Sequence, residues 1–349
     1  MCGLRSAFVQ PAMRACERKF SPLRRVKFRY NFANLTKEKR VSVEFSVKNK
    51  KRPLFMGYSD AMSVGKALDL LPDLSVFDID ESAEGFDERA FLKSPLSEQE
   101  CLILGVQGKS GRGMELRYDE ERQGYAVRVN TPATVFDWVL AISYLQALSK
   151  QLQSEIADEN GEIYTHDSIE QFDYERDISA GLHSIDQHLS GDTEVNFCYW
   201  VERPFAINRA MMDEILASYN PSAEFSKRLT EVQYLGAYSA HQRFYRNGDD
   251  GTIMGSYALT QDLPTILPYK PFVEWQNTEM LKNNDVARWQ IALIGIEGDE
   301  NDAGNYHAIA ELEYGEFIAR LPKQNYRFID ASYILVDGLN VNQLKALAG

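Results

Sequence analysis

The sequence predicts an α+β protein with mostly antiparallel or mixed sheets, helices packed on one side, and two subdomains. Most of the expected strands are joined by hairpin-type turns rather than by regular βαβ crossovers, which favours antiparallel or mixed sheets. From Pro132 to about Leu152, apolar residues recur at three- and four-residue steps, as in a helix with one buried face. A chain of 349 residues exceeds what one hydrophobic core usually serves, so we expect two domains.

The first expected element is Val41–Val47, where apolar and polar residues alternate as they do in a half-buried strand. Ser63 has the position of an N-cap for a short helix that Pro72 stops. The acidic stretch Asp73–Asp87 has no sustained period, so we expect a loop there. The other strands that precede the long helix are expected at Pro53–Tyr58, Cys101–Val106, Gly113–Tyr118 and Tyr125–Val129.

We place the boundary between the two domains at the turn Asp158–Gly161, so that the domains cover residues 41–157 and 158–349. In the second domain, Val195–Ile207 is expected to be one long strand. Asn247–Gly251 has the composition of a hairpin turn. Helices are expected at 166–189, 208–218, 221–230, 314–320 and 340–348, and strands at 234–245, 252–260, 287–297, 305–312 and 328–336.

Residues 1–40 differ in charge from the rest of the chain. They hold eleven Lys or Arg and two acids, a net charge of +9, whereas residues 41–349 carry −22. This basic N-terminal extension fits a transit peptide, a disordered tail that touches phosphates, or a translation start assigned too far upstream. The third interpretation is favoured, because Lys37–Arg40 can be encoded by purines alone, like a bacterial ribosome-binding site, and Val41 by a GUG start codon. We therefore expect residues 1–40 to be disordered or to lie outside the translated protein.

Composition limits the class of protein. No apolar run approaches the roughly 20 residues of a membrane-spanning helix, and no secretion signal is apparent. The four cysteines form no close pair, so neither a disulfide framework nor a zinc knuckle is expected. We expect a cytoplasmic protein that does not bind membranes.

The catalytic motifs that the chain suggests at first sight are incomplete. Gly108-Lys109-Ser110 resembles the end of a phosphate-binding loop, but Ile103 stands where that motif needs its first glycine. Arg112 stands where a nucleophile elbow needs its second glycine. We expect a Gly-rich hairpin turn with a solvated Lys109, and the catalytic residues stay unknown.

The acidic loops and the histidines do not predict a metal site. Asp299–Gly304 begins like a calcium loop, but Ala303 offers no side-chain oxygen at the third ligand position, and Ala310 stands where a bidentate Glu is required. His183 and His188 are five residues apart, so a helix would point them to different faces. We therefore expect neither a metal nor a cofactor.

Aromatic residues concentrate in the second domain. A Tyr-rich strand surface can be a binding face, but ordinary sheet packing explains the pattern better. Few basic residues are interleaved with these aromatics, so stacking of single-stranded nucleic acid is not expected. The aromatic residues lie at Phe197–Trp200, Tyr234, Tyr238, Phe244, Tyr245, Tyr269, Phe272 and Trp275.

Val41–Lys51, Cys101–Gly113 and Thr131–Val139 with its following helix are similar to segments of a family of bacterial cytosolic proteins. The members are about three hundred residues long and of unknown function. The similarity starts at Val41 and covers nearly all of the chain after it. It implies a bacterial, cytoplasmic protein, and it supplies no catalytic residues.

Two classes of function remain. The preferred one is a non-catalytic protein-binding or regulatory module, of the immunity-protein sort that masks a basic partner. The charge of −22 on residues 41–349 repels nucleic acid and lipid headgroups and attracts basic surfaces. The alternative is an enzyme whose site lies in the cleft between the domains and is assembled from residues distant in sequence. The sequence leaves the oligomeric state open.

Overall fold

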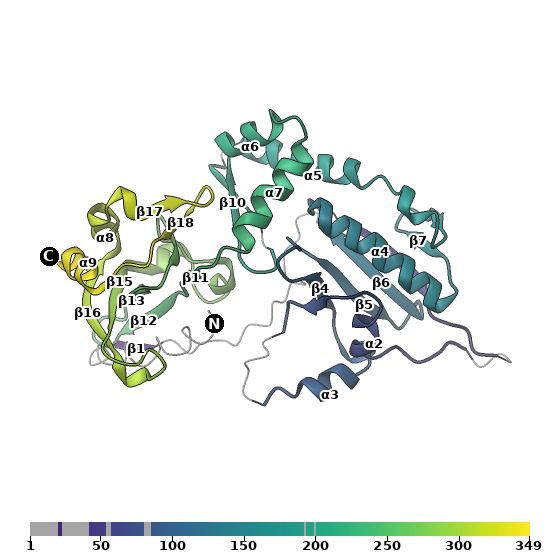
Figure 1. Cartoon of the computed structure of the whole chain (residues 1–349), viewed down its shortest axis with the longest axis horizontal. Coiled ribbons are helices and arrows are strands. Elements are labelled where there is room, and N and C mark those ends of the chain that lie inside the picture. The colour runs from purple at the N-terminus through teal and green to yellow at the C-terminus, as the bar shows by residue number, and fades with distance from the viewer. Residues whose placement is uncertain (1–19, 23–41, 54–56, 80–84, 192, 199) are drawn as a thin grey trace. The chain divides into compact units, whose positions relative to one another are not determined.

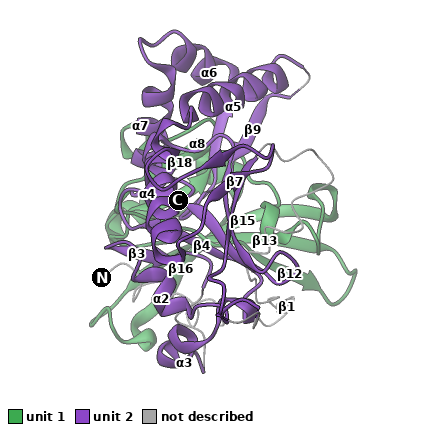
Figure 2. Ribbon diagram, turned by 90° about the vertical axis from the view of Figure 1, so that its right-hand side faces the viewer, with its two compact units in different colours: residues 1–28, 235–349 green, residues 29–234 purple. Residues whose placement is uncertain are grey.

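The computed structural model describes residues 20–22, 42–53, 57–79, 85–191, 193–198 and 200–349. The chain forms two compact units: unit 2 comprises residues 29–234, and unit 1 comprises residues 1–28 with 235–349 (Figure 2). Helices and antiparallel or mixed sheets occur in the same chain, so the predicted α+β class is confirmed.

Unit 2 is built on one antiparallel sheet with the strand order β3-β4-β5-β6-β2-β7-β8. Helix α4 (Val135–Leu152) packs on one face of this sheet, against β2 and β6 (Figure 1). The strands are β2 (Ser42–Lys48), β3 (Leu74–Val76), β4 (Leu102–Val106), β5 (Met114–Asp119), β6 (Gly124–Asn130), β7 (Ile156–Asp158) and β8 (Ile163–Tyr164).

Helix α4 begins at a capping box. The side chain of Thr134 accepts a hydrogen bond from the backbone N–H of Asp137, and the Asp137 side chain accepts one from the backbone N–H of Thr134. One turn into the helix, Trp138 is fully buried, and its ring lies 6.5 Å from that of Phe45 on β2. The long helix is thus confirmed, but its burial is not confined to one face. The consecutive residues Leu140, Ala141 and Ile142 are also buried, because α4 contacts α5 and α7 as well as the sheet.

The stretch Asp73–Asp87, expected to be a loop, contains strand β3. Leu74 pairs with Val106 across the edge of the sheet, so β3 is held by backbone hydrogen bonds to β4. All three residues of β3 are only partly buried. A strand this short shows no side-chain period in the sequence, which explains why the prediction of a loop was wrong for these three residues. Residues 80–84 of the expected loop lie outside the described residues.

The single long strand expected at Val195–Ile207 is also wrong. The segment forms β9 (Val195–Cys198) and β10 (Phe205–Asn208), which pair with each other as an antiparallel hairpin. The charged pair Glu202-Arg203 and Pro204 interrupt the apolar run, and the prediction of one strand overlooked this break. The other helices of unit 2 are α2 (Val64–Leu68), α3 (Glu88–Lys93), α5 (Tyr174–Leu189), α6 (Arg209–Leu216) and α7 (Pro221–Gln233).

The two compact units divide between Tyr234 and Leu235. The expected boundary at residues 157 and 158 lies inside unit 2, where Asp158 ends β7 and the following turn leads into β8 of the same sheet. The composition of a turn marks a reversal of the chain and carries no information about which sheet the next strand joins. Of the basic extension 1–40, the structure describes Phe20–Pro22, which forms strand β1; the rest lies outside the described residues.

Unit 1 contains two sheets, with the strand orders β1-β12-β13-β15-β16 and β11-β14-β18-β17. Both are mixed, because β13 pairs parallel with β15 and β11 pairs parallel with β14. Helices α8 (Tyr314–Arg320) and α9 (Val341–Ala348) contribute to a core between these elements. The strands are β11 (Tyr238–Ser239), β12 (Arg243–Asn247), β13 (Ile253–Thr260), β14 (Thr265–Pro268), β15 (Val286–Ile296), β16 (Tyr306–Glu313), β17 (Tyr326–Phe328) and β18 (Tyr333–Val336).

Two expectations for unit 1 need correction, and one strand was not anticipated. The strand expected at 234–245 is divided into β11 and β12, and the one expected at 328–336 is the hairpin β17–β18. Strand β14 was not anticipated, because Pro264 and Pro268 flank its short apolar run. Among the described residues, no helix combines the length and the apolar character that crossing a membrane requires.

Candidate functional site

The face of the unit 2 sheet that turns away from α4 carries charged side chains. Along β2, Phe45 and Val47 are fully buried, whereas Glu44 and Ser46 alternate with them and point to the other face. The strand register places Glu44 opposite Arg128 on β6, and Arg128 opposite Glu115 on β5. The sequence thus folds so that charges from three strands meet on one surface.

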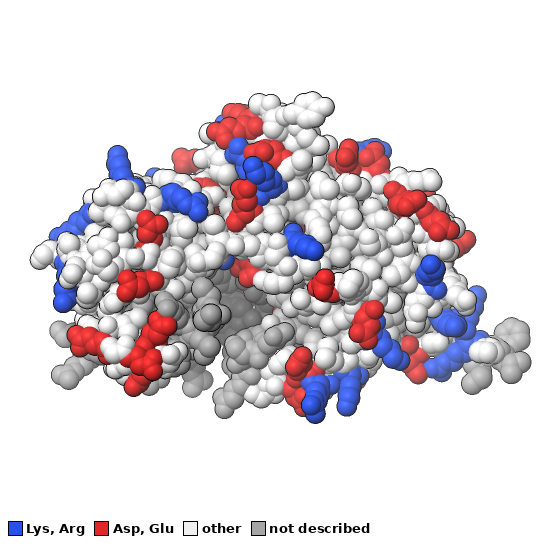
Figure 3. All heavy atoms as spheres, viewed as in Figure 1, with Lys and Arg blue, Asp and Glu red and all other residues white. Residues whose placement is uncertain are grey.

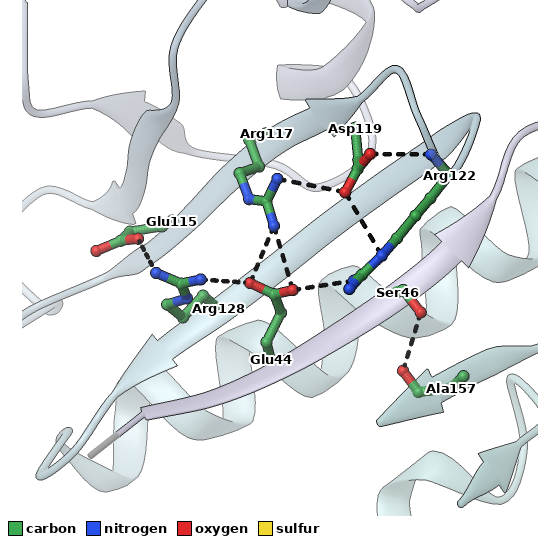
Figure 4. Close-up of polar contacts among 8 residues, drawn as sticks. All are labelled: Glu44, Ser46, Glu115, Arg117, Asp119, Arg122, Arg128 and Ala157. Carbon is green, nitrogen blue, oxygen red and sulfur yellow. Dashed lines mark hydrogen bonds and ion pairs between the residues drawn. The ribbon is translucent and has the colours of Figure 1, made fainter. Parts of the chain in front are cut away.

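Glu44 is the centre of this charged network (Figure 4). Its carboxylate oxygens lie 2.6 Å from Nη2 of Arg128, 3.2 Å from Nη2 of Arg117 and 3.4 Å from Nη1 of Arg122. Only 14% of the Glu44 side chain is exposed. Burial alone would raise the pKa of Glu44, but the hydrogen bond from Arg128 and the charges of Arg117 and Arg128 outweigh it and hold the pKa below its ordinary value.

Two further carboxylates flank the network. Glu115 lies 3.8 Å from Nη1 of Arg128, and Asp119 lies 3.5 Å from Nη1 of Arg117. Three guanidinium groups therefore meet three carboxylates, and the surface is electrically balanced. The network joins β2, β5 and β6 through their side chains, and its charged groups already have partners within it.

A second polar surface of unit 2 is not balanced. We call it the acidic face; it runs from Glu155, directly before β7, to Glu175 in the first turn of α5. This stretch contains no Lys or Arg, and Figure 3 shows carboxylates gathered over it. The exposed carboxylates of the acidic face belong to Glu155, Glu159, Glu162, Asp167, Glu170, Asp173 and Glu175.

The backbone beneath the acidic face is held by short-range hydrogen bonds. The buried carboxylate of Asp158 accepts hydrogen bonds from the backbone N–H groups of Asn160 (2.9 Å) and Glu162 (2.8 Å), which shapes the β7–β8 turn. Ile169 is fully buried in the following 3-10 helix, Ile169–Gln171. Asp173 caps α5 by accepting a hydrogen bond from the N–H of Arg176. The carboxylates thus project from backbone with defined geometry.

Gly108-Lys109-Ser110 forms a turn between β4 and β5, where a strand follows rather than a helix. Gly108 has φ of +79°, a conformation that favours glycine. Lys109 is exposed, and its Nζ lies 5.9 Å from the centre of the Phe136 ring. Ser110 is buried, and its hydroxyl accepts the backbone N–H of Val106. The segment therefore has the expected hairpin-type geometry.

Behind this turn, Asp137 is completely buried and serves as an acceptor. Its carboxylate accepts hydrogen bonds from the backbone N–H of Arg112 (2.8 Å) and of Gly113 (3.0 Å), and from the hydroxyl of Thr134 (2.8 Å). Burial raises the pKa of Asp137, and these hydrogen bonds oppose the rise. Sequence reasoning did not single out this residue, although the Thr134-x-x-Asp137 spacing is the signal of a capping box.

The histidines and the acidic loop serve local structure. His183 and His188 are both exposed on α5, and a ring nitrogen of His183 lies 2.9 Å from Nε2 of Gln187. Asp299 accepts the backbone N–H of Asn301 within its own turn. Within the described ranges, no group of three or more His, Cys, Asp or Glu side chains is placed to hold a metal ion.

In unit 1, the carboxyl of Glu274 is buried among neutral groups. The amide of Gln276 donates to it at 2.5 Å, and the hydroxyls of Tyr257 and Tyr333 also hydrogen-bond to it. Gln242 holds the same segment, because its Oε1 accepts the backbone N–H of Glu274 at 3.0 Å. Burial raises the pKa of Glu274 to about 7, and these hydrogen bonds lower it only in part. The cluster joins residues that lie far apart in sequence, and no local sequence pattern predicts it.

These features define an α+β protein with a balanced charged sheet face, an acidic face and a buried carboxyl cluster. The profile of the family described as a domain of unknown function (DUF4299) matches residues 42–347, and the chain belongs to this family. The resemblance to an uncharacterised family is confirmed to that extent. No curated protein and no solved structure matches the chain significantly.

Proposed function

We propose that this protein is a non-catalytic protein-binding or regulatory module of the bacterial cytoplasm. In this proposal the acidic face binds a basic partner protein, in the way that an immunity protein masks a basic target. The observation that carries the proposal is the group of seven exposed carboxylates between Glu155 and Glu175, an interval without Lys or Arg.

The distribution of charge supports the acidic face as the contact surface. Residues 41–234 carry −16, and residues 235–349 carry −6, so most of the negative charge after residue 40 lies in the part of the chain that bears this face. A surface of one sign speeds the approach of a partner of opposite sign and slows that of nucleic acid or anionic lipid. Among the exposed carboxylates of the acidic face, Asp167 lies 3.5 Å from a ring nitrogen of His166. Exposed carboxylates of this kind lose little existing interaction energy when a partner's Lys or Arg replaces water beside them.

The Glu44 network supports the same assignment by contrast. Its six charges are satisfied within the sheet, and only 14% of the Glu44 side chain is exposed. A partner that bound there would have to break ion pairs that already exist, whereas the acidic face offers carboxylates that carry unbalanced charge. The partner should therefore contact the β7–α5 stretch.

Two variants with the same net charge test the location. The first replaces four exposed glutamates of the acidic face, Glu159, Glu162, Glu170 and Glu175, with Gln. The matched control replaces four exposed glutamates of unit 1, Glu279, Glu297, Glu300 and Glu311, with Gln. Each variant removes four negative charges, so a difference between them reports position and not total charge.

Each tagged variant is used to recover partners from the native lysate, with washes at low and then high salt. We expect the wild type and the unit 1 control to retain a basic protein at low salt, and the acidic-face variant to lose it. Salt should weaken the retention, because the Debye length shrinks from about 10 Å at 0.1 M to about 3 Å at 1 M. Equal retention by both variants, or recovery of nucleic acid, would contradict the proposal. Recovery of no partner by any form would favour the enzyme alternative.

A further inference from the structure

Strand β17 is the terminal strand of the sheet β11-β14-β18-β17 (Figure 1). It pairs antiparallel with β18, and its Arg327 lies opposite Leu335. The hydrogen bonds on either side of the pairing run from Ile329 N–H to Tyr333 C=O and from Asp337 N–H to Asn325 C=O. Hydrogen-bonded and non-bonded pairs alternate along an antiparallel ladder. The peptide groups of residues 326 and 328 therefore point away from β18, toward the open edge of the sheet.

The same edge carries an aromatic platform made of Tyr269, Tyr326 and Phe328. The ring of Phe328 lies 4.9 Å from that of Tyr269, and the rings of Tyr269 and Tyr326 stack at 6.1 Å. The two tyrosines pack against the core of unit 1, but Phe328 is 52% exposed. A large apolar ring held in place on one side and open to water on the other is a favourable anchor for a partner side chain.

The charge beside this platform is opposite to that of the surrounding unit. Lys270, Lys323 and Arg327 are all exposed within or next to the platform segments. Asp330 is buried and accepts the backbone N–H groups of Ser332 and Tyr333, so it is part of the β17–β18 turn. The exposed carboxylate of Asp337 lies at the other end of the hairpin. Residues 235–349 as a whole hold 15 acids and 9 bases, so three bases around one short strand reverse the local sign.

We propose that the β17 edge binds an extended, acidic segment of a partner protein by strand addition. The outward peptide groups of residues 326 and 328 hydrogen-bond the added strand. An apolar side chain of that strand rests on Phe328, and its carboxylates meet Lys270, Lys323 and Arg327. Strand addition draws its affinity from main-chain hydrogen bonds and its specificity from alternate side chains. This edge belongs to unit 1, whereas the acidic face belongs to unit 2, and the edge selects a partner segment of the opposite charge.

Lysine and arginine on an edge strand also prevent unwanted strand pairing. If the three bases serve only that purpose, no acidic strand should bind. A library of random peptides of about twelve residues, displayed on phage, distinguishes the two roles when it is selected against the full chain. We expect enrichment of peptides that alternate apolar and acidic residues. A selection that enriches no peptide of this kind would overturn the proposal.

The selected peptide is then synthesised with a fluorescent label, and its binding is followed by fluorescence anisotropy. Phe328→Ser and Arg327→Glu should each weaken binding by at least about tenfold, since both remove a central contact. Methylation of alternate backbone nitrogens of the peptide should abolish binding, because strand addition needs their N–H groups. Lys345→Glu changes an exposed base on α9 by the same charge and should leave affinity unchanged.

Circular dichroism melts of the variants establish that they are folded. Phe328 is half exposed, and Arg327 is exposed, so neither substitution should shift the melting temperature appreciably. Undiminished binding by folded Phe328→Ser and Arg327→Glu variants would place the peptide elsewhere and refute the proposed edge. Undiminished binding of the methylated peptide would refute strand addition.

Discussion

In unit 2 the carboxylate of Glu44 is surrounded by guanidinium groups, whereas in unit 1 the carboxyl of Glu274 is surrounded by amide and phenol groups. The pKa of Glu44 is consequently held below its ordinary value, and that of Glu274 is raised to about 7. The two carboxyl groups thus favour different charge states, because guanidinium groups stabilise the ionised form of the partly buried Glu44, whereas deep burial among neutral groups favours the protonated form of Glu274. The comparison shows that unit 2 keeps the carboxylate of Glu44 ionised beside its guanidinium partners, whereas unit 1 keeps the buried carboxyl of Glu274 protonated up to about pH 7.

The largest expected effect tests where unit 2 keeps its apolar contacts. The outer face of its sheet carries charges, so burial of apolar surface depends on the α4 side, where Trp138 is fully buried. Trp138→Ala should reduce the free energy of unfolding by about 3–5 kcal/mol, as deletions of large buried aromatic rings do. Chemical denaturation measures the change. A loss below about 1 kcal/mol would show that the charged face, and not α4, stabilises the sheet.

The next effect concerns pH and Glu274. In the unfolded chain this carboxyl ionises near its ordinary pKa of 4.5, but in the fold it stays protonated up to about pH 7. Its contribution to stability is therefore complete below pH 4.5 and is lost as the pH rises through 7. The loss should be on the order of 3 kcal/mol, since each pKa unit corresponds to about 1.4 kcal/mol.

Glu274→Gln is the matched variant, because an amide keeps the hydrogen-bonding shape and does not ionise. The unfolding free energy of unit 1 should then lose most of its decline between pH 4.5 and 7. Denaturation followed across that range gives the slope for both proteins. Identical slopes in the wild type and the variant would mean that Glu274 is ionised in the fold, and the contrast between the units would disappear.

A smaller effect is expected for Glu44, with the opposite dependence on pH. Glu44→Gln leaves three guanidinium groups around a neutral amide, and it should cost about 1–3 kcal/mol, between the values for exposed and buried pairs. Because the pKa of Glu44 is lowered in the fold, its contribution is present above its ordinary pKa of 4.5 and is lost as the pH falls through the lowered value. A variant as stable as the wild type at neutral pH would argue against this network as a structural element.

The smallest effect serves as the control within the same network. The side chain of Arg122 is 63% exposed and approaches Glu44 at 3.4 Å. Arg122→Ala should change the free energy of unfolding by less than about 1 kcal/mol, as exposed ion pairs generally do. If Arg122→Ala reduced the free energy of unfolding as much as Glu44→Gln does, the network would depend on its most exposed residue. That result would contradict the expectation that the more buried Glu44 contributes more to stability.

The sequence predicted those elements whose pattern is local. The alternation in Val41–Val47 and the period of the long helix both correspond to observed elements, β2 and α4. Strand β3 could not be predicted, because a strand of three residues is defined by its partner and not by a period. The reversal between β9 and β10 was overlooked, although Pro204 interrupts the apolar run. The same reason hides the candidate sites. Glu44 lies 73 residues from Arg117 and 84 residues from Arg128 in the sequence, and it meets them only through strand register.

The acidic face was only partly visible in the sequence. Overall negative charge was apparent, but its concentration depends on which carboxylates the fold leaves exposed. Asp158 is buried and shapes a turn, whereas Glu159 and Glu162 beside it are exposed. The number of charges therefore predicted the class of partner, a basic protein. The positions of the exposed carboxylates are the reason why we propose the acidic face as its contact surface.

Zero-length carbodiimide cross-linking of the recovered complex tests the central claim most directly, because it joins a carboxylate only to a lysine amine in contact with it. Peptide mapping then identifies the carboxylates that face the basic partner. The proposal predicts that the cross-links map to the acidic face, between Glu155 and Glu175, and that high salt suppresses them. Cross-links that map instead to the exposed acids of unit 1, between Glu297 and Glu316, would contradict it.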